Sequence, residues 1–376
     1  LVIAIRYAVV RRQFGGSTGT KENQIMDYKT HQFRLITLLS SVYAMQFVGM
    51  QVRHDYESLL AKMAKADSRS PDMRKIITNL KDVHATSAGL KAMCTWTTLH
   101  TIEQCRQSLG GMGYLAYANL STMYQDHAVQ CTWEGDNTVL TLQTGRYLVS
   151  CLRDLKSGKS LPNGVNYLNL IPTMKGMTLE SKDVARLDHI QKAFDVTCAN
   201  LVLQAGKVVE GFMSKGQKLE GALEKASAAT FIAAKLHCLN YMFRTLKKAS
   251  EEAPADLKSN LSNICTLFGL YVIHENAGSF LQFGFLKPEH MSMVDSKLLE
   301  MLETIRPQVV ALTDAFGLSD FVINSPLGCY DGDVYRRLMD RVTQSNPQGE
   351  HAYFERTIKP AIHREEIPKD SIKLNI

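Results

Sequence analysis

The fold of this chain is decided first by residues 27–65, which read DYKTHQFRLITLLSSVYAMQFVGMQVRHDYESLLAKMAK. Apolar side chains recur there at the i, i+3, i+4 spacing that gathers them on one face of a helix. They are Leu35, Leu38, Leu39, Val42 and Met45. Asp27 precedes the periodic part and suits a helix N-cap, because its carboxylate can accept from unpaired backbone N–H groups. The pattern predicts one long amphipathic helix.

The next segment predicts a second long helix with its own apolar face. It begins at Ser70-Pro71, since proline suits the first helical turn, and it ends at Gly110-Gly111. The apolar face consists of Ile76, Ile77, Leu80, Val83, Leu90 and Cys94. Upstream, residues 1–13 read as an amphipathic helix followed by a Gly/Ser/Thr-rich turn at 15–19. The opening LVIAIRY looks like a helix cut in the middle, so we expect a partial sequence or a processed product.

The rest of the chain is predicted to be helical on both sides of one interruption. Short helices around 119–128 and 136–153 complete a first bundle. Glycine and proline interrupt the pattern at 156–180, which predicts a linker or a long surface loop. Further helices are expected around 182–214, 218–250, 255–281, 296–316 and 332–343. We therefore predict an all-α fold with two antiparallel helical bundles, residues 1–155 and 181–376, joined by a long linker.

Composition argues against several classes of protein. Of 376 residues, 45% are hydrophobic and 21% charged, as is ordinary for a soluble globular protein with a real core. The net charge of +6 is spread along the chain without a long like-charged run. This argues against nucleic-acid binding and suits an anionic small ligand, although a generic basic surface is the simpler explanation. No uninterrupted apolar stretch reaches the ~18–20 residues that span a bilayer, so we expect no membrane span.

The cysteines and histidines predict no metal site. The eight cysteines lie far apart, without a CxxC pair or a Cys/His cluster of zinc-ligand spacing. Most lie among apolar residues, where a free cysteine behaves as a small buried hydrophobe. A reducing compartment is the simpler interpretation. The N-terminus lacks the basic start and cleavage site of a signal peptide.

Residues 7–15, YAVVRRQFG, form the first of three motifs that carry chemistry. Arg11 lies at a predicted helix end, and Phe14 and Gly15 follow it. A guanidinium presented in this way can bind a pyrophosphate through two hydrogen bonds. The alternative is a solvated basic helix end, because cations are favoured near helix C-termini.

Residues 107–114, QSLGGMGY, form the second motif. Its glycines allow the backbone to approach a ligand closely. It is not a dinucleotide-binding fingerprint, because a helix rather than a strand precedes it. The alternative is a glycine helix stop.

Residues 126–138, DHAVQCTWEGDNT, form the third motif. Glu134 follows Trp133 and precedes Gly135 and a predicted helix. An aromatic neighbour can desolvate a carboxylate, which is one way in which proteins obtain a useful general base. The alternative is an acidic residue favourably placed near a helix N-terminus.

In this order and spacing, the three motifs resemble the acyl-CoA dehydrogenase and oxidase superfamily. Residues 105–149, CRQSLGGMGYLAYANLSTMYQDHAVQCTWEGDNTVLTLQTGRYLV, look specifically like peroxisomal acyl-CoA oxidases. The second helical region also fits, since the shorter dehydrogenases lack it. The resemblance implies an FAD enzyme that oxidises fatty acyl-CoA to trans-2-enoyl-CoA and reduces oxygen to hydrogen peroxide. Glu134 matches the base that removes the α-proton, while the flavin takes the hydride.

The resemblance also implies a cofactor site. Arg11 and Phe14 match positions that reach the FAD of a neighbouring subunit, which implies a homodimer at least. The stretch that contacts the adenine, ribose and pyrophosphate side is matched by Gln107, Gly110 and Gly111. Weaker cofactor candidates, just past the base, are Asp136 and Thr138.

The chain departs from the family pattern in two ways. The helical and β-domains with which the family begins are absent. The chain ends in SIKLNI and not in a terminal Ser-Lys-Leu, so a peroxisomal location is implied by the resemblance alone. Two alternatives stay open: a dehydrogenase that passes electrons to a carrier protein, and an inactive helical fragment or dimerisation partner.

Overall fold

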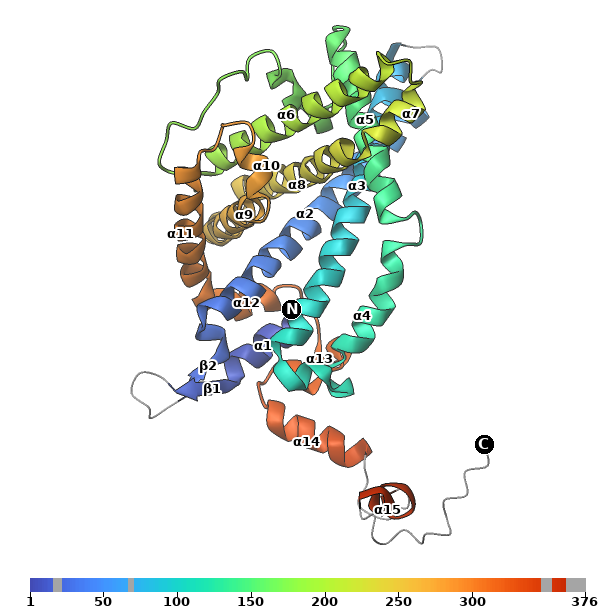
Figure 1. Cartoon of the computed structure of the whole chain (residues 1–376). Coiled ribbons are helices and arrows are strands. Elements are labelled where there is room, and N and C mark those ends of the chain that lie inside the picture. Colours follow the sequence, from blue (N-terminus) through green and yellow to red (C-terminus); the bar gives the residue numbers. More distant parts are fainter. Residues whose placement is uncertain (16–21, 67–70, 346–353, 363–376) are drawn as a thin grey trace, which may run out of the picture.

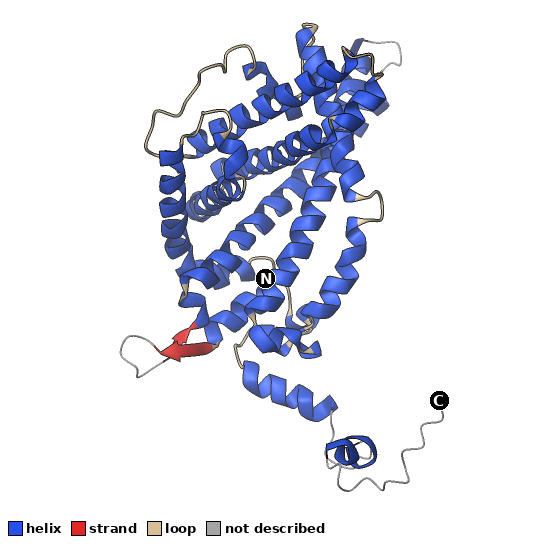
Figure 2. Ribbon diagram, in the orientation of Figure 1, coloured by secondary structure: helices blue, strands red, loops and turns tan. Residues whose placement is uncertain are grey.

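The computed structural model describes residues 1–15, 22–66, 71–345 and 354–362. Long helices make up most of these residues, so the predicted all-α class is confirmed (Figure 2). In the described part of the chain, the strands are limited to one short antiparallel ribbon, β1–β2.

The first half of the chain contains the elements that carry all three motifs (Figure 1). In order they are α1 (Val2–Val10), β1 (Arg12–Gly15), β2 (Glu22–Gln24), η1 (Ile25–Asp27), α2 (Lys29–Lys65), α3 (Pro71–Ser108), η2 (Gly110–Tyr114), η3 (Ala116–Ala118), α4 (Leu120–Ala128), η4 (Val129–Cys131) and α5 (Asn137–Lys156).

The second half begins with a 3₁₀ helix and continues with long helices. Its elements are η5 (Asn163–Leu170), α6 (Leu187–Met213), α7 (Leu219–Lys225), α8 (Ser227–Glu252), α9 (Ala255–Glu275), α10 (Ala277–Leu281), α11 (Pro288–Ile305), η6 (Arg306–Gln308), α12 (Val309–Asp314), α13 (Asp320–Ile323), η7 (Pro326–Gly328), α14 (Val334–Ser345), the π-helical η8 (Phe354–Ile358) and α15 (Lys359–Ile362).

The two long helices predicted at the start of the chain are confirmed as α2 and α3. The predicted cap of α2 is wrong. Tyr28 is the N-cap residue, and Asp27 ends the 3₁₀ helix before it. The Asp27 carboxylate instead accepts a hydrogen bond from Nε of Arg306 at 2.9 Å, which ties the start of α2 to η6.

The helix predicted at residues 1–13 ends early, at Val10. Its continuation is the strand β1, which pairs antiparallel with β2. The side-chain amide of Gln24, in β2, donates to the carbonyl of Val9 at 2.6 Å and so satisfies a free acceptor at the helix end. The pairing partner lies in a separate segment, so periodicity within residues 1–13 gave no sign of it.

The helix predicted at 296–316 also differs from the structure. It begins at Pro288, which occupies the first turn of α11, and stops at Ile305. Pro307 follows in η6, where its missing N–H group and its ring prevent continuation of an α-helix. The segment predicted at 255–281 is likewise divided, because Asn276 has a non-helical backbone between α9 and α10.

Helix α2 qualifies as a membrane span by length and composition, with a mean hydropathy of 1.4 over its most apolar window. Serine and threonine interrupt its apolar residues, so it contains no uninterrupted apolar stretch of spanning length. In the structure, 56% of that window is buried. The helix packs against α3, α8 and α9, so the buried window belongs to the shared core.

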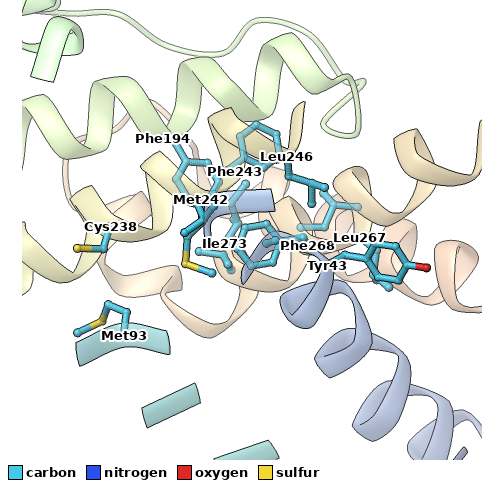
Figure 3. Close-up of a cluster of buried hydrophobic side chains, with 14 of the residues drawn as sticks. Tyr43, Met93, Phe194, Cys238, Met242, Phe243, Leu246, Leu267, Phe268 and Ile273 are labelled. Atoms are coloured by element: carbon cyan, nitrogen blue, oxygen red, sulfur yellow. The ribbon is translucent and has the colours of Figure 1, made fainter. Parts of the chain in front are cut away.

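Helices from both halves of the chain share one hydrophobic core. Helix α8 packs against α5 and α2, across residues 156–180 in sequence. Figure 3 shows part of this core, where the rings of Phe194 and Phe243 stack with centroids 5.1 Å apart. Gly269 leaves room for the Phe243 ring, because an added Cβ would lie 2.6 Å from it.

Residues 156–180 do more than run over the surface. Within η5, the side chains of Val165, Tyr167 and Leu168 are buried in the core. The segment therefore packs against the helices that it connects. The division of the chain into domains at this segment stays a prediction.

Candidate functional site

Five of the residues assigned to the cofactor by resemblance line one groove of about 950 Å³. They are Arg11, Phe14, Gln107, Gly110 and Gly111. They come from the α1–β1 junction and from the end of α3, which are far apart in sequence. The fold brings them together at the end of the molecule where β1 and β2 lie (Figure 1).

The two adjacent arginines of the first motif have different surroundings. NH1 of Arg12 donates to the backbone carbonyl of Glu22 at 2.8 Å, which fastens Arg12 to β2. NH1 of Arg11 is 3.5 Å from the hydroxyl of Tyr335, which is a long contact. Arg11 therefore keeps most of its donors for a ligand in the groove.

Phe14 stands at the mouth of the groove with 68% of its surface exposed. Its φ of 63° is unusual for a residue other than glycine. The ring meets Tyr28 edge to face, with centroids 6.4 Å apart. The Tyr28 hydroxyl donates to the carbonyl of Gln13 at 2.9 Å and steadies the strand beneath Phe14. Residues other than glycine that are held at positive φ cluster at functional sites.

Gln107 is held at the exposed edge of the groove by the side chains one turn before it. Its amide nitrogen donates to Oε1 of Glu103 at 2.7 Å. Arg106 binds the same carboxylate through Nε and NH2, at 2.8 and 2.7 Å. The hydrogen bonds from Arg106, and then from Gln107, lower the pKa of Glu103 to about 2. The arrangement restricts the Gln107 side chain before any ligand binds.

The glycines of the second motif differ in their backbone conformation and in the space around them. Gly110 has a φ of 61° and follows the end of α3, so the glycine stop expected there is present. At Gly110 and Gly111 an added Cβ would meet nothing within 4 Å, so the groove has free space above the backbone of these two residues. At Gly113 an added Cβ would lie 1.9 Å from the carbonyl oxygen of Arg106. The turn therefore requires Gly113 for packing.

His31 also lines the groove, although no sequence motif pointed to it. Its Nε2 is buried and has no hydrogen-bond partner among the described residues. Burial, and then the charge of Arg34, lowers the pKa of His31 to about 4, so the ring is neutral near pH 7. Tyr28 and His31 are three residues apart at the start of α2, a spacing that places two side chains on one helix face. This spacing was the sequence signal that both residues line the groove.

Glu134, Asp136 and Thr138 lie away from the groove, in the turn before α5 and in its first helical turn. Glu134 is exposed, and its φ of 56° lies in the left-handed region. Trp133 is 51% exposed, and its indole N–H donates to Oε1 of Gln130 at 2.9 Å. Within the described part of the chain, Trp133 does not shield Glu134 from solvent.

Asp136 is the residue that caps α5. Its Oδ1 accepts from the backbone N–H groups of Thr138 and Val139, at 2.9 and 3.2 Å. The favourable placement of an acidic residue at this helix N-terminus therefore belongs to Asp136. Glu134 lies two residues earlier, and its carboxylate has no hydrogen bond to another described residue. Thr138 is exposed in the first turn of α5.

The Glu134 turn is fastened to α3 by two buried or half-buried polar residues. Nζ of Lys91 donates to the carbonyl of Gly135 and to Oδ1 of Asn137, both at 2.8 Å. The amide nitrogen of Asn137 donates to Oγ1 of Thr95 at 2.9 Å. Sequence reasoning missed both Lys91 and Asn137, because nothing in the local pattern links a lysine in α3 to this turn.

Helix α3 connects the two regions. Lys91, under the Glu134 turn, and Gln107, in the groove, lie on the same helix, and their separation along its axis is about 24 Å at the usual rise per residue. The groove and the Glu134 turn thus contact α3 at two separate points along its length. Among the described residues, no three His, Cys, Asp or Glu side chains gather to hold a metal ion.

Comparison with known proteins identifies the chain's relatives. The family model described as "Acyl-CoA oxidase, C-alpha1 domain" matches residues 1–149, and the model described as "Acyl-CoA oxidase" matches residues 186–363. Acyl-coenzyme A oxidase 2 of Yarrowia lipolytica is 35% identical over all of this chain and 54% of its own length. Peroxisomal acyl-coenzyme A oxidase 1 of Mus musculus is 34% identical over 95% of this chain and 54% of its own.

Solved structures agree with the sequence relatives. The crystal structure of acyl-CoA oxidase 3 from Yarrowia lipolytica superposes with a TM-score of 0.92 at 37% identity, covering all of this chain and 55% of that one. Acyl-CoA oxidase-1 of Caenorhabditis elegans, solved in complex with FAD and ATP, gives a TM-score of 0.87 at 30% identity, covering 96% of this chain and 54% of that one. The chain spans about half the length of the curated relatives it matches. With two family models matched and the fold shared, the chain belongs to the acyl-CoA oxidase family.

Proposed function

We propose that this chain contributes the catalytic base and part of the FAD-binding surface to an enzyme that oxidises fatty acyl-CoA to trans-2-enoyl-CoA. The observation that carries the proposal is the single groove formed by Arg11, Phe14, Gln107 and the Gly110-Gly111 turn. Bound FAD would take up the hydride from the β-carbon and deliver its electrons to oxygen, yielding hydrogen peroxide.

The groove has the donors that a dinucleotide needs. The Arg11 guanidinium matches a pyrophosphate in charge and in its forked geometry. Gly110 and Gly111 present backbone without side chains, so a ligand can approach closely. The unpartnered Nε2 of His31 adds a buried polar atom that a ligand would satisfy. The described residues therefore fit the adenine, ribose and pyrophosphate part of FAD.

Glu134 is proposed to remove the proton α to the thioester. A general base must approach that proton to within hydrogen-bonding distance or through one water. The exposed position of Glu134 leaves its carboxylate accessible to a substrate. A bound acyl-CoA and the rest of a full-length enzyme would cover it and supply the desolvation that Trp133 alone does not. Asp136 and Thr138 stay weaker cofactor candidates beside it.

We further propose that the enzyme is a homodimer at least. By resemblance, the groove binds the FAD of a neighbouring subunit, whereas Glu134 serves the reaction at a separate place. The roughly 24 Å between the two sites along α3 supports this arrangement. Dilution of the purified enzyme should then release FAD and dissociate the dimer together, as analytical ultracentrifugation with flavin detection would show.

The test of the catalytic proposal is Glu134→Gln in the full-length, FAD-loaded enzyme. The variant keeps the size and hydrogen-bonding shape of the side chain but loses its basicity. Anaerobic mixing with acyl-CoA should show flavin bleaching slowed by roughly 10²–10⁴, the usual contribution of general-base catalysis. Glu220→Gln is the matched control, since Glu220 is exposed and pairs with Arg146 at 3.1 Å. Bleaching of the Glu134→Gln enzyme at the wild-type rate would remove Glu134 from the mechanism.

The alternatives make different predictions in the same assay. A dehydrogenase would be reduced by acyl-CoA but reoxidised slowly by oxygen, whereas an oxidase is reoxidised rapidly. An inactive fragment or dimerisation partner would retain no flavin. Because relatives from mouse and rat are named peroxisomal oxidases, we propose a peroxisomal location. Co-localisation of the tagged protein with a peroxisomal marker would test it.

A further inference from the structure

We propose that Lys91 is a positioning residue for the reaction, which holds the backbone of the turn that carries Glu134 without touching the substrate. This inference rests on the role proposed for Glu134. Lys91 lies on α3 and is half-buried beneath the turn that leads into α5. It acts through Gly135 and Asn137, which lie one and three residues after Glu134 in the chain.

The ammonium group of Lys91 makes two short hydrogen bonds to the turn. Nζ of Lys91 donates to the carbonyl oxygen of Gly135 at 2.8 Å and to Oδ1 of Asn137 at 2.8 Å. Hydrogen bonds from a charged donor are shorter and stronger than those between neutral groups. The Gly135 carbonyl belongs to the residue directly after Glu134, so the ammonium fixes the backbone immediately next to the base.

The backbone of the turn has an unusual conformation. Glu134 and Gly135 both have positive φ, at 56° and 116°. A left-handed backbone is unfavourable for a glutamate, and it persists only where the surroundings hold it. An added Cβ at Gly135 would lie 2.9 Å from Cδ2 of Leu140, so the turn is packed closely on that side. Lys91 provides a polar restraint next to this strained glutamate.

The second acceptor, Asn137, is itself bound to α3. Asn137 is 1% exposed, and its amide nitrogen donates to Oγ1 of Thr95 at 2.9 Å and to the carbonyl of Ala92 at 3.4 Å. Lys91, Ala92 and Thr95 all lie on α3. Two residues of the turn, Gly135 and Asn137, are therefore attached to α3. Lys91 donates a hydrogen bond to each of them.

The experiment replaces Lys91 with methionine, which has similar length but no donor, in the full-length FAD-loaded enzyme. A base displaced by about 1 Å can lose on the order of 10²-fold in rate. We expect the rate of anaerobic flavin reduction to fall by about that factor, while KM for acyl-CoA and FAD content stay close to wild type. Lys91→Arg should recover part of the rate because it restores a charged donor.

A second readout follows the turn without reference to catalysis. Hydrogen–deuterium exchange in a peptide covering residues 132–140 should be faster in Lys91→Met, because the backbone there loses its restraint. Lys247→Met is the matched control: Lys247 is also half-buried and binds two carboxylates, of Asp188 and Glu251, at 3.0 and 2.5 Å. That variant should leave both the reduction rate and the exchange at 132–140 unchanged.

The outcomes separate this inference from the proposed function. If Lys91→Met reduces its flavin at the wild-type rate while Glu134→Gln is slow, Lys91 has no positioning role and the base assignment stands. If Glu134→Gln is as fast as wild type, the proposed function fails, and exchange at 132–140 still tests whether Lys91 holds the turn. Unchanged exchange in Lys91→Met, or an equal rate loss in Lys247→Met, overturns the inference.

Discussion

Nε of Arg6 donates to Oδ1 of Asp314 at 3.0 Å across 308 residues of sequence. The same guanidinium reaches Asp320 at 3.3 Å and the carbonyl of Gly328 at 2.7 Å. Its carbon lies 5.2 Å from the ring centre of Tyr330, within the range of a cation–π contact. Arg6 is thus a buried clamp that ties α1, which leads into the groove at Arg11, to residues 314–330.

Arg6→Met should therefore destabilise the fold. It leaves two carboxylates without their cation, and we expect a loss of about 3 kcal/mol, the low end for a broken buried pair because both acids are partly exposed. Arg53→Met is the matched control, since Arg53 pairs with Glu57 on an exposed helix face and its loss should leave stability almost unchanged. Urea denaturation measures both. Equal shifts in the two variants would contradict the clamp.

Arg11→Lys should weaken FAD binding without altering the fold. A lysine ammonium keeps the charge but lacks the two parallel donors, and a lost charged hydrogen bond amounts to roughly 10–100-fold in affinity. Arg12→Lys is the control, because Arg12 is already bound to the Glu22 carbonyl. The measurement is flavin occupancy after dialysis of the full-length enzyme. If Arg12→Lys loses FAD and Arg11→Lys retains it, the two arginines have been assigned the wrong way round.

Gly113→Ala should disturb the turn at the groove. The new Cβ would lie 1.9 Å from the Arg106 carbonyl, which is backbone and must move, so we expect a loss of about 1–3 kcal/mol. Gly111→Ala meets nothing within 4 Å and should leave the melting temperature almost unchanged. Comparison of the two melting temperatures is decisive. A larger effect at Gly111 would mean that this turn packs differently from the structure.

Stability should depend on pH through His237. Burial, and then the charge of Arg244, lowers the pKa of His237 to about 3 from an ordinary 6.5. Below pH 6.5 the unfolded chain binds a proton that the folded chain excludes, so the free energy of unfolding falls as the pH decreases toward 3. The expected slope from this group is about 1.4 kcal/mol per pH unit. The contribution of His237 to the free energy of unfolding is fully present above pH 6.5.

His237→Gln tests this dependence. Glutamine does not titrate and can keep a hydrogen bond to the Tyr167 hydroxyl, which is 3.1 Å from Nδ1 in the structure. Urea midpoints at pH 7, 6 and 5 should therefore fall less steeply for the variant than for wild type. His54→Gln, on the exposed surface of α2, should keep the wild-type slope. An unchanged slope in His237→Gln would show that other groups govern the acid sensitivity.

Local sequence patterns predicted what depends on local structure. The apolar periodicity of α2 and α3 was enough to find both helices, and Pro71 marked where α3 begins. The family resemblance of the motifs was enough to name five of the residues that line the groove, but not His31 or Tyr28. Contacts between distant segments were out of reach, because no periodicity relates Arg6 to Asp314 or Lys91 to Gly135. The strand at residues 12–15 was missed for the same reason, since a strand exists only where its partner pairs with it.

The length of helix α3 sets the distance between the groove and the Glu134 turn. Because an α-helix advances and turns by a fixed amount per residue, one residue inserted between Lys91 and Gln107 would rotate the Glu134 turn by about 100° around the axis relative to the groove. Substitutions along this stretch preserve the register, whereas insertions and deletions destroy it. The roles proposed for the groove and for Glu134 therefore depend on the length of α3 between Lys91 and Gln107 as well as on the side chains themselves.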